Sequence, residues 1–313
     1  MRPDACDGGG NGRAVRRRLA WLLFAGSLPI LAPAALAAES YAACTGFIDA
    51  LPATVGTAGT WCLRDDLSTS LASGAAITLA APDITLDCNG FKLGGLGAGP
   101  GTEAIGIEAT DQGNNTVRRC NVRGFRTGIS VSGGGGGHVV EDNRVELSTH
   151  IGIQVGGNSS STLSVVRRNH VLDTGDGADD FYTGIMVYST GAPTGGGVDV
   201  LDNSVNGFNA GSSAQVRGIE VSSDHHALVS GNLVRGDATW AVRVFNAAAV
   251  VLRGNRLIGP GTRLASYGLR CVNASQPAEY DGYAKDNMIL GFDNGLGCDD
   301  VGGNVVEALV ITP

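Results

Sequence analysis

The hexapeptides Val166-Arg167-Arg168-Asn169-His170-Val171 and Val200-Leu201-Asp202-Asn203-Ser204-Val205 share one pattern, in which an asparagine stands between two apolar residues. The asparagine lies three positions after the first apolar residue and two before the second. The pattern occurs seven times, at intervals of 17 to 34 residues, with its asparagines at Asn143, Asn169, Asn203, Asn232, Asn255, Asn287 and Asn304. A short unit that recurs in this way is typical of a solenoid, whose units bury their apolar faces only by stacking.

A second repeat runs in phase with the first and has the form Gly-Ile-x-Val. Its copies or close relatives start at Gly106, Gly128, Gly152, Gly184, Gly218, Ala241, Gly268 and Gly295. The alternation of apolar and variable residues predicts a short, half-buried strand, and each asparagine unit predicts two more strands around a tight turn. Three short strands per repeat indicate an all-β, single-domain parallel β-helix of about eight to nine coils. Leucine-rich repeats are the main solenoid alternative, but their leucine-dense signature is absent from the sequence.

The repeated asparagines have a structural interpretation. A buried amide both donates and accepts hydrogen bonds, and asparagine tolerates the left-handed backbone of a sharp corner. Coils stack at roughly 4.8 Å, the ordinary spacing of paired strands. The asparagines are therefore predicted to form a hydrogen-bonded ladder inside the helix rather than a catalytic row.

The N-terminal segment is typical of an export signal. Arg16, Arg17 and Arg18 precede an apolar run over residues 19–37, which ends in the small-x-small sequence Ala35-Leu36-Ala37. We expect cleavage before residue 38, so that residues 1–37 are a signal peptide and the protein is exported to the periplasm, cell surface or medium. The alternative is a membrane anchor, which two prolines in the run disfavour. No later segment is apolar for long enough to span a membrane.

The charge of the chain restricts its partners. The sequence holds 22 basic and 30 acidic residues, and removal of the five arginines and two aspartates of the signal segment leaves 17 and 28, a net charge of about −11. An acidic surface argues against nucleic acid and against anionic membranes as partners. A local basic groove for an acidic polymer remains compatible with this balance.

Six cysteines remain after the signal segment, an even number that suggests disulfides in an exported chain. Cys271 and Cys298 occupy the same slot of successive repeats, and Cys88 and Cys120 occupy related slots one coil apart. Stacked residues lie within the Cα distance that a disulfide spans, so these pairs are predicted, and Cys44–Cys62 follows by elimination. The alternatives are free thiols or a metal site, and zinc is disfavoured because no C-x-x-C spacing occurs.

The stacked Val-x-x-Asn-x-Val and Gly-Ile-x-Val units resemble the right-handed parallel β-helix repeats of the pectate-lyase-like superfamily, over about residues 80–306. The N-terminal stretch, with Gly59-Thr60-Trp61-Cys62-Leu63 and residues 84–90, resembles the first coil of uncharacterised bacterial exported β-helix proteins. The resemblance implies a right-handed β-helix over residues 83–306, an N-terminal cap with a lead-in strand at 38–82, and a tail at 307–313. The superfamily includes lyases, hydrolases, epimerases, phage tailspikes and adhesins, so the resemblance specifies the fold and not the activity.

The repeat also predicts where a site would lie. In Gly-Ile-x-Val the apolar pair points inward, so the x residue and the residue after Val point outward. On four successive coils this outer column reads Met186/Tyr188, Glu220/Ser222, Arg243/Phe245 and Arg270/Val272. Aromatic faces and charges of this kind suit a saccharide. We therefore assign Glu220, Arg243 and Arg270 as candidate catalytic residues, with Tyr188, Phe245 and His225 as candidate substrate contacts.

Each of these candidates has a simpler explanation. The three charged residues also fit an exposed ion-pair ladder, and surface ion pairs are common. The loop over residues 170–183 carries Asp176, Asp179 and Asp180, which are candidate calcium ligands, although the loop lacks EF-hand spacing, and this favours a solvated loop. His225 fits either a general base or a polar loop residue.

Two functions remain open on the sequence. The first is a non-catalytic β-helix that binds a polysaccharide or serves as a surface or envelope scaffold, and the absence of the hydrolase and epimerase signature runs favours it. The alternative is a lyase-like enzyme acting on an acidic, uronate-containing polymer. In that case Arg243 or Arg270 binds the uronate or removes the proton next to its carboxylate. Glu220 and the Asp179 region hold calcium, the candidate cofactor, and the cation stabilises the resulting charge.

Overall fold

A computed structural model describes residues 41–133, 135–157, 162–189, 197–209, 215–223, 226–261, 265–272 and 282–308. These residues belong to one unit, Ser40–Pro313. The predicted signal segment 1–37, the tail from 309 onward and His225 lie outside the described residues. Within the described residues, no helix is long and apolar enough to cross a membrane.

The chain winds into three parallel sheets, here named A, B and C, in which each coil contributes one strand to each sheet in the order A, C, B. Sheet A contains β1 (Gly46–Phe47), β3 (Gly59–Cys62), β6 (Ile84–Asp87), β9 (Thr116–Arg118), β12 (Val139–Glu141), β15 (Ser164–Arg167), β18 (Val198–Leu201), β21 (Leu228–Ser230), β24 (Val250–Arg253), β27 (Gly282–Lys285) and β30 (Asp299–Asp300). Sheet B contains β2 (Ala53–Val55), β5 (Ala75–Leu79), β8 (Ile105–Thr110), β11 (Thr127–Ser132), β14 (Ile151–Gly157), β17 (Phe181–Ser189), β20 (Gln215–Ser222), β23 (Trp240–Phe245), β26 (Tyr267–Val272) and β29 (Asn294–Gly297). Sheet C contains β4 (Leu67–Ser68), β7 (Lys92–Gly94), β10 (Asn121–Arg123), β13 (Arg144–Glu146), β16 (His170–Gly175), β19 (Ser204–Asn209), β22 (Leu233–Arg235), β25 (Arg256–Ile258), β28 (Met288–Phe292) and β31 (Val305–Ala308).

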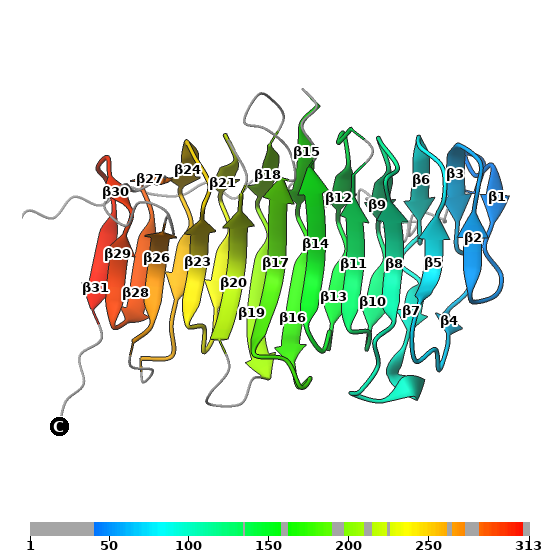
Figure 1. The fold of residues 1–313 in the computed structure, drawn as a ribbon, viewed down its shortest axis with the longest axis horizontal. Helices are drawn as coiled ribbons and strands as arrows, with labels where there is room; N and C mark the ends of the chain where they lie inside the picture. Colours follow the sequence, from blue (N-terminus) through cyan, green and yellow to red (C-terminus); the bar gives the residue numbers. More distant parts are fainter. Residues whose placement is uncertain are drawn as a thin grey trace, which may run out of the picture. The chain divides into compact units, whose positions relative to one another are not determined.

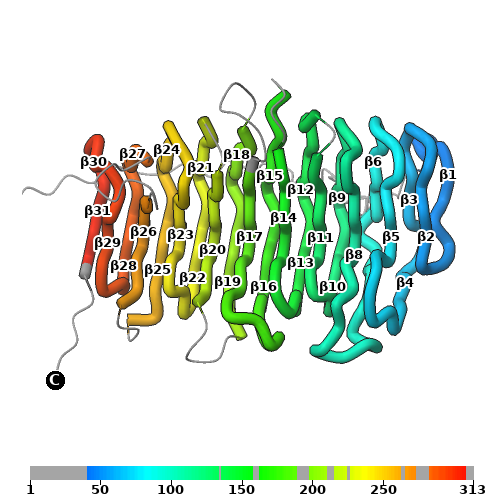
Figure 2. Tube along the Cα trace, in the orientation of Figure 1, coloured from blue at the N-terminus to red at the C-terminus, as the bar shows by residue number. Residues whose placement is uncertain are grey.

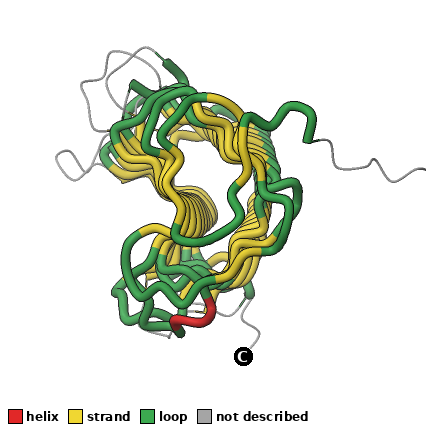
Figure 3. Tube along the Cα trace, turned by 90° about the vertical axis from the view of Figure 1, so that its right-hand side faces the viewer, coloured by secondary structure: helices red, strands yellow, loops and turns green. Residues whose placement is uncertain are grey.

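The strands of sheet B run side by side along the front of Figure 1, and the colour of the chain advances steadily from one coil to the next in Figure 2. Viewed along the stack, the strands of successive coils superimpose (Figure 3). The predicted parallel β-helix is confirmed, and from β6 onward each sheet holds eight or nine strands, in agreement with the eight to nine coils expected. The segment expected to be a cap adds β1 to β5, which pair within the same three sheets. A short 3-10 helix, Leu96–Ala98, interrupts one connection.

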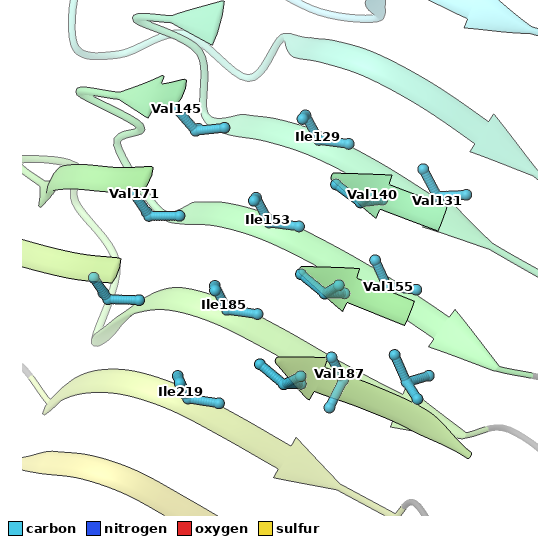
Figure 4. Close-up of a cluster of buried hydrophobic side chains, with 14 of the residues drawn as sticks. Ile129, Val131, Val140, Val145, Ile153, Val155, Val171, Ile185, Val187 and Ile219 are labelled. Carbon is cyan, nitrogen blue, oxygen red and sulfur yellow. The ribbon is translucent and has the colours of Figure 1, made fainter. Parts of the chain in front are cut away.

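Sequence repeats create a continuous apolar core. The isoleucines of the Gly-Ile-x-Val strands stand in register in sheet B, as Ile129, Ile153, Ile185 and Ile219, and all are fully buried. Valines from sheets A and C, such as Val140 and Val171, fill the space behind them (Figure 4). Burial of each such side chain contributes about 1.5–3 kcal/mol, which is the main force that holds one coil on the next.

A tight corner joins each sheet A strand to the following sheet C strand. The residue before each ladder asparagine has a positive φ, as in Asp142 (φ 56), Asp202 (φ 55) and Gly231 (φ 69). This left-handed residue turns the chain sharply and directs the following asparagine inward. The conformation is uncommon for residues with a side chain, and aspartate or glycine meets it at several corners.

The asparagine ladder has the predicted form. The Nδ2 of Asn169 donates to the Oδ1 of Asn203 at 3.0 Å and to the carbonyl of Val140 at 2.8 Å. The backbone N–H of Asn169 donates to the same Oδ1 at 2.9 Å. The amide-to-amide contact is repeated at 2.9–3.0 Å through Asn143, Asn169, Asn203, Asn232, Asn255, Asn287 and Asn304. The ladder therefore satisfies buried backbone groups at every corner, a structural role.

Three disulfides connect neighbouring coils, and all have the predicted partners. The Cα–Cα distance is 5.9 Å for Cys44–Cys62, 4.7 Å for Cys88–Cys120 and 5.0 Å for Cys271–Cys298. Cys120 stands at the start of the asparagine ladder, since its backbone N–H donates to the Oδ1 of Asn143 at 3.0 Å. Each disulfide thus fixes the same stacking that the hydrogen bonds of the sheets produce.

Candidate functional site

The outer face of sheet B carries the predicted column of residues. Register pairs join Met186 to Glu220, Glu220 to Arg243, and Arg243 to Arg270. The neighbouring column joins Tyr188, Ser222, Phe245 and Val272 in the same way. The repeat therefore placed three charged candidates and both aromatic candidates correctly on one face. The parallel register brings them together because each coil returns to the same strand position.

Glu220 is more buried than a surface ladder would require, at 2% exposure. Its Oε2 lies 2.6 Å from Arg217 Nη1 and 3.4 Å from Arg243 Nη1. The side chains of Arg217 and Arg243 are themselves only 11% and 14% exposed. A carboxylate shared by two guanidiniums in such a position is a partly desolvated ion-pair cluster, since solvent screens it far less than an exposed pair.

Aromatic rings hold the guanidiniums of this cluster. The Cζ of Arg217 lies 4.2 Å from the ring centroid of Phe181, and the Cζ of Arg243 lies 4.9 Å from the ring of Trp240 and 4.2 Å from that of Phe245. These distances fit cation–π contacts, each worth about 0.5–2 kcal/mol. Burial lowers the pKa of Arg243, and the neighbouring Arg217 lowers it further, while Glu220 opposes the shift.

Arg270 completes the row in β26. Its Cζ lies 4.2 Å from the ring of Tyr267, which is the register partner of Trp240. We name the aromatic and charged side chains of this face the sheet B platform, and it consists of Phe181, Arg217, Glu220, Trp240, Arg243, Phe245, Tyr267 and Arg270. All of these except Arg217 and Glu220 are partly exposed.

Tyr188 lies two coils before Phe245, with Ser222 between them in register. Its hydroxyl accepts a hydrogen bond from the Nε2 of Gln154 at 3.3 Å, so the tyrosine is held at the edge of the platform rather than stacked within it. The predicted contact through His225 falls outside the described residues. Its role stays a prediction.

Asp176, Asp179 and Asp180, the candidate calcium ligands, lie between β16 and β17. Within the described residues, no three His, Cys, Asp or Glu side chains are placed to bind a metal together. The Oδ1 of Asp179 instead lies 2.7 Å from the Nη2 of Arg126. Asp176 lines a small cavity of about 200 Å³ with Thr149, and Asp180 uses its backbone carbonyl to accept from the N–H of Gln215 at 3.0 Å. All three carboxylates nevertheless lie near Tyr182, since burial and the charges of these aspartates together raise its pKa.

Asp179 belongs to a second polar cluster beside the platform. Its Oδ2 lies 3.7 Å from the Nδ1 of His150, which is 8% exposed. The imidazole packs edge-on against Phe181 with ring centroids 4.6 Å apart, so this ring separates His150 from Arg217. Burial lowers the pKa of His150, although Asp179 opposes the shift.

Sequence reasoning missed Arg217, Phe181, Arg126 and His150. Arg217 had a usable signal, since it precedes Gly218 in the slot that Trp240 and Tyr267 occupy in later coils. No sequence signal indicated the contact between Arg126 and Asp179. These two residues are 53 positions apart, and a loop conformation that the repeat does not specify joins them.

Together, the three parallel sheets, the coil-to-coil register and the internal asparagine ladder define a parallel β-helix. Residues 98–279 match the family model described as "Right handed beta helix region", which covers more than half of the chain. The protein belongs to this family, and the handedness that the resemblance implied is confirmed. No curated protein matches the sequence.

Solved structures with similar folds include proteins that handle polysaccharides. The A-module of the mannuronan C-5 epimerase AlgE6 from Azotobacter vinelandii aligns over 79% of this chain and 83% of its own, with 13% identity and a TM-score of 0.47. The catalytic domain of a GH87 alpha-1,3-glucanase aligns with 12% identity and a TM-score of 0.34, over 83% of this chain and 63% of its own. The tailspike protein of E. coli bacteriophage HK620 aligns with 12% identity and a TM-score of 0.33, over 87% of this chain and 61% of its own. This chain thus spans less than two thirds of the glucanase and tailspike chains.

Proposed function

We propose that the protein is exported and binds a polysaccharide along the outer face of sheet B, without a catalytic step. The observation that carries this proposal is the sheet B platform, in which four aromatic rings and three guanidiniums share one face of four successive coils. The three disulfides are typical of proteins that mature outside the reducing cytosol.

The chemistry of the platform suits a sugar chain. An aromatic ring offers an apolar face to the C–H groups of a pyranose, while a guanidinium offers several donors to hydroxyl and carboxylate oxygens. Coils follow one another at roughly 4.8 Å, so equivalent contacts repeat along the helix axis. The charges of the platform favour an anionic ligand, because its three arginines and one glutamate leave a local excess of two positive charges on a chain whose net charge is −8.

The ion-pair geometry explains why we favour binding over catalysis. Both guanidiniums beside Glu220 are directed at its carboxylate, so this group already has charged partners and is poorly placed to accept a proton or hold calcium. Its role in the proposal is to hold Arg217 and Arg243 in place.

A binding experiment tests the proposal. The mature protein is titrated with acidic and neutral oligosaccharides, and dissociation constants are compared for the wild type and for Trp240→Ala and Phe245→Ala. We expect about a tenfold loss of affinity for each variant, as for buried aromatic contacts at other interfaces. Tyr283→Ala is the matched control, because Tyr283 is an exposed aromatic residue in sheet A. Equal affinities in all four proteins would remove the platform from the proposed site.

One observation keeps the lyase alternative in view, namely the lowered pKa of Arg243. A lowered pKa increases the share of the neutral guanidine, which is the form that can remove a proton beside a uronate carboxylate. Incubation of the mature protein with uronate polymers and calcium, followed by absorbance of the unsaturated product, tests this alternative. Product formation that Arg243→Lys abolishes would replace the binding proposal with an enzymatic one.

A further inference from the structure

The residue Arg243 has unlike neighbours on the two adjacent coils. Its register partner in β20 is Glu220, and its register partner in β26 is Arg270. On the β20 side a carboxylate lies between two guanidiniums, those of Arg217 and Arg243. On the β26 side Arg243 and Arg270 are direct register partners, and neither strand supplies a carboxylate between them.

Arg270 makes no ion pair with the residues that the structure describes. Its guanidinium lies over the ring of Tyr267, with the Cζ 4.2 Å from the ring centroid. Like charges on directly paired positions of neighbouring strands repel one another. The repulsion is not relieved by movement of Arg243, since that guanidinium is held between the rings of Trp240 and Phe245 and is turned toward Glu220. Among the residues that the structure describes, Arg270 therefore lies beside Arg243 without a counter-charge of its own.

We infer that the interval between Arg243 and Arg270 is an anion-binding subsite, which takes the carboxylate of an acidic sugar residue. The inference rests on the proposed function, and it specifies which part of the platform selects the ligand. The ligand carboxylate would form ion pairs with Arg243 and Arg270, in the way that the Glu220 carboxylate forms ion pairs with Arg217 and Arg243. A row of alternating positive and negative groups would then extend over three coils, those of β20, β23 and β26.

Two further observations agree with a subsite at this place. The Nε of Arg243 is buried and has no hydrogen-bond partner in the structure, although a buried donor without a partner is costly. The pKa of Arg243 is lowered by burial, and Arg270 is among the charges that contribute, so an anion bound beside both would oppose this shift. The electrostatic attraction between such an anion and the two arginines would be stronger here than on an open surface, because the site is partly shielded from water.

A uronate carboxylate, a sulfate ester and a free inorganic anion share the chemistry that this subsite recognises. We favour the carboxylate, because Glu220 shows that a carboxylate fits between two guanidiniums on adjacent coils. The test therefore compares three probes: uronate oligosaccharides, the methyl esters of the same oligosaccharides, and sodium sulfate at constant ionic strength. The methyl esters keep the sugar backbone and remove only the negative charge.

The first part of the test uses binding. Arg270→Gln is expected to weaken binding of uronate oligosaccharides at least tenfold, while the affinity for their methyl esters changes less than twofold. Arg253→Gln is the control, because Arg253 lies one strand after Arg243 but in sheet A, and its side chain is 62% exposed. Equal affinity of the wild type for uronates and their methyl esters would overturn the subsite and leave the polysaccharide proposal intact.

The second part needs no sugar. Arg270→Glu places a carboxylate beside Arg243 on the side opposite Glu220, so it should mimic the bound anion. We expect this variant to unfold at a higher temperature than Arg270→Gln and to lose the stabilisation by sulfate that the wild type shows. If Arg270→Glu is the less stable of the two and sulfate does not stabilise the wild type, the subsite is refuted. If no oligosaccharide binds but both of these results are obtained, the anion subsite stands and the polysaccharide proposal fails.

Discussion

The carbonyl of Val166 and the side-chain amide of Asn203 lie 2.9 Å apart, although 37 residues separate them in the sequence. This bond crosses from one coil to the next and satisfies a carbonyl inside the helix, where water has no access. The Oδ1 of Asn203 accepts at the same time from the backbone and the side chain of Asn169. The side chain of Asn203 thus forms hydrogen bonds with three groups of the neighbouring coil: one carbonyl, one backbone N–H and one side-chain amide.

Removal of one ladder amide should destabilise the helix strongly. In Asn203→Ala, the carbonyl of Val166 and the backbone N–H of Asn169 lose their side-chain partner while they remain buried. We expect the free energy of unfolding to fall by about 3 kcal/mol, since each unpaired buried group costs about 1–3 kcal/mol. Urea denaturation measures this change. Asn206→Ala, which removes a partly exposed amide from the next strand, should change it by less than about 1 kcal/mol. Similar losses in both variants would contradict the structural role of the ladder.

Glu220→Gln should lower stability because it leaves Arg217 and Arg243 without their shared counter-charge. Breaking a buried ion pair by removing one partner costs about 3–5 kcal/mol. The two arginines retain slight exposure, at 11% and 14%, so we expect roughly 2–3 kcal/mol. Thermal and urea unfolding measure it.

The control for this substitution is Asp66→Asn, which breaks an exposed pair with Lys92 at 3.3 Å. Exposed pairs of this kind contribute at most about 1 kcal/mol. An equal effect of the two substitutions would show that Glu220 belongs to an ordinary surface ladder.

Acidification should destabilise the protein through His138, which is fully buried. Its Nδ1 accepts from the N–H of Asn115 at 3.4 Å and its Nε2 faces the carbonyl of Gly133 at 3.1 Å, an arrangement that requires the neutral imidazole. Burial lowers the pKa of His138 below its ordinary value of 6.5. The unfolded chain therefore binds more protons than the folded one, so stability falls as the pH drops below about 6.5. The fall ends at the lower pKa of the folded state.

Denaturation midpoints at pH 7.5, 6.5 and 5.5 test this dependence. His150, whose pKa burial also lowers, should add to the same trend. We expect His138→Asn to reduce the pH dependence but not to abolish it. Identical pH profiles of the variant and the wild type would assign the whole dependence to other groups.

Loss of the disulfide Cys271–Cys298 should be costly because it closes a loop of 27 residues. In the loop-entropy model this crosslink contributes roughly 3–4 kcal/mol. The double variant Cys271→Ser/Cys298→Ser should therefore denature at a clearly lower urea concentration than the wild type. Peptide mapping of the oxidised wild type should yield the 271–298 crosslink, and a crosslink from residue 271 to any other cysteine would contradict the stacking of these coils.

The periodic part of the structure could be read from the sequence. The spacing of asparagine and of Gly-Ile-x-Val predicted the solenoid, the amide ladder, the three disulfide pairs and the outer column from Met186 to Arg270. All of these except Cys44–Cys62, which was predicted by elimination, are properties of equivalent or related positions in successive coils. Since parallel stacking places equivalent positions over one another at a fixed distance, a repeat in the sequence becomes a row in space.

The non-periodic part was decided only by the tertiary structure. The burial of Glu220 between Arg217 and Arg243, and the contact of Asp179 with Arg126, depend on side-chain direction and on loop conformation. Neither property repeats from coil to coil, because the loops next to the sheet B strands differ in length and place different side chains beside each strand. The sequence by itself therefore determined which residues stack, whereas the tertiary structure determined which of them are shielded from water and which charge each one faces.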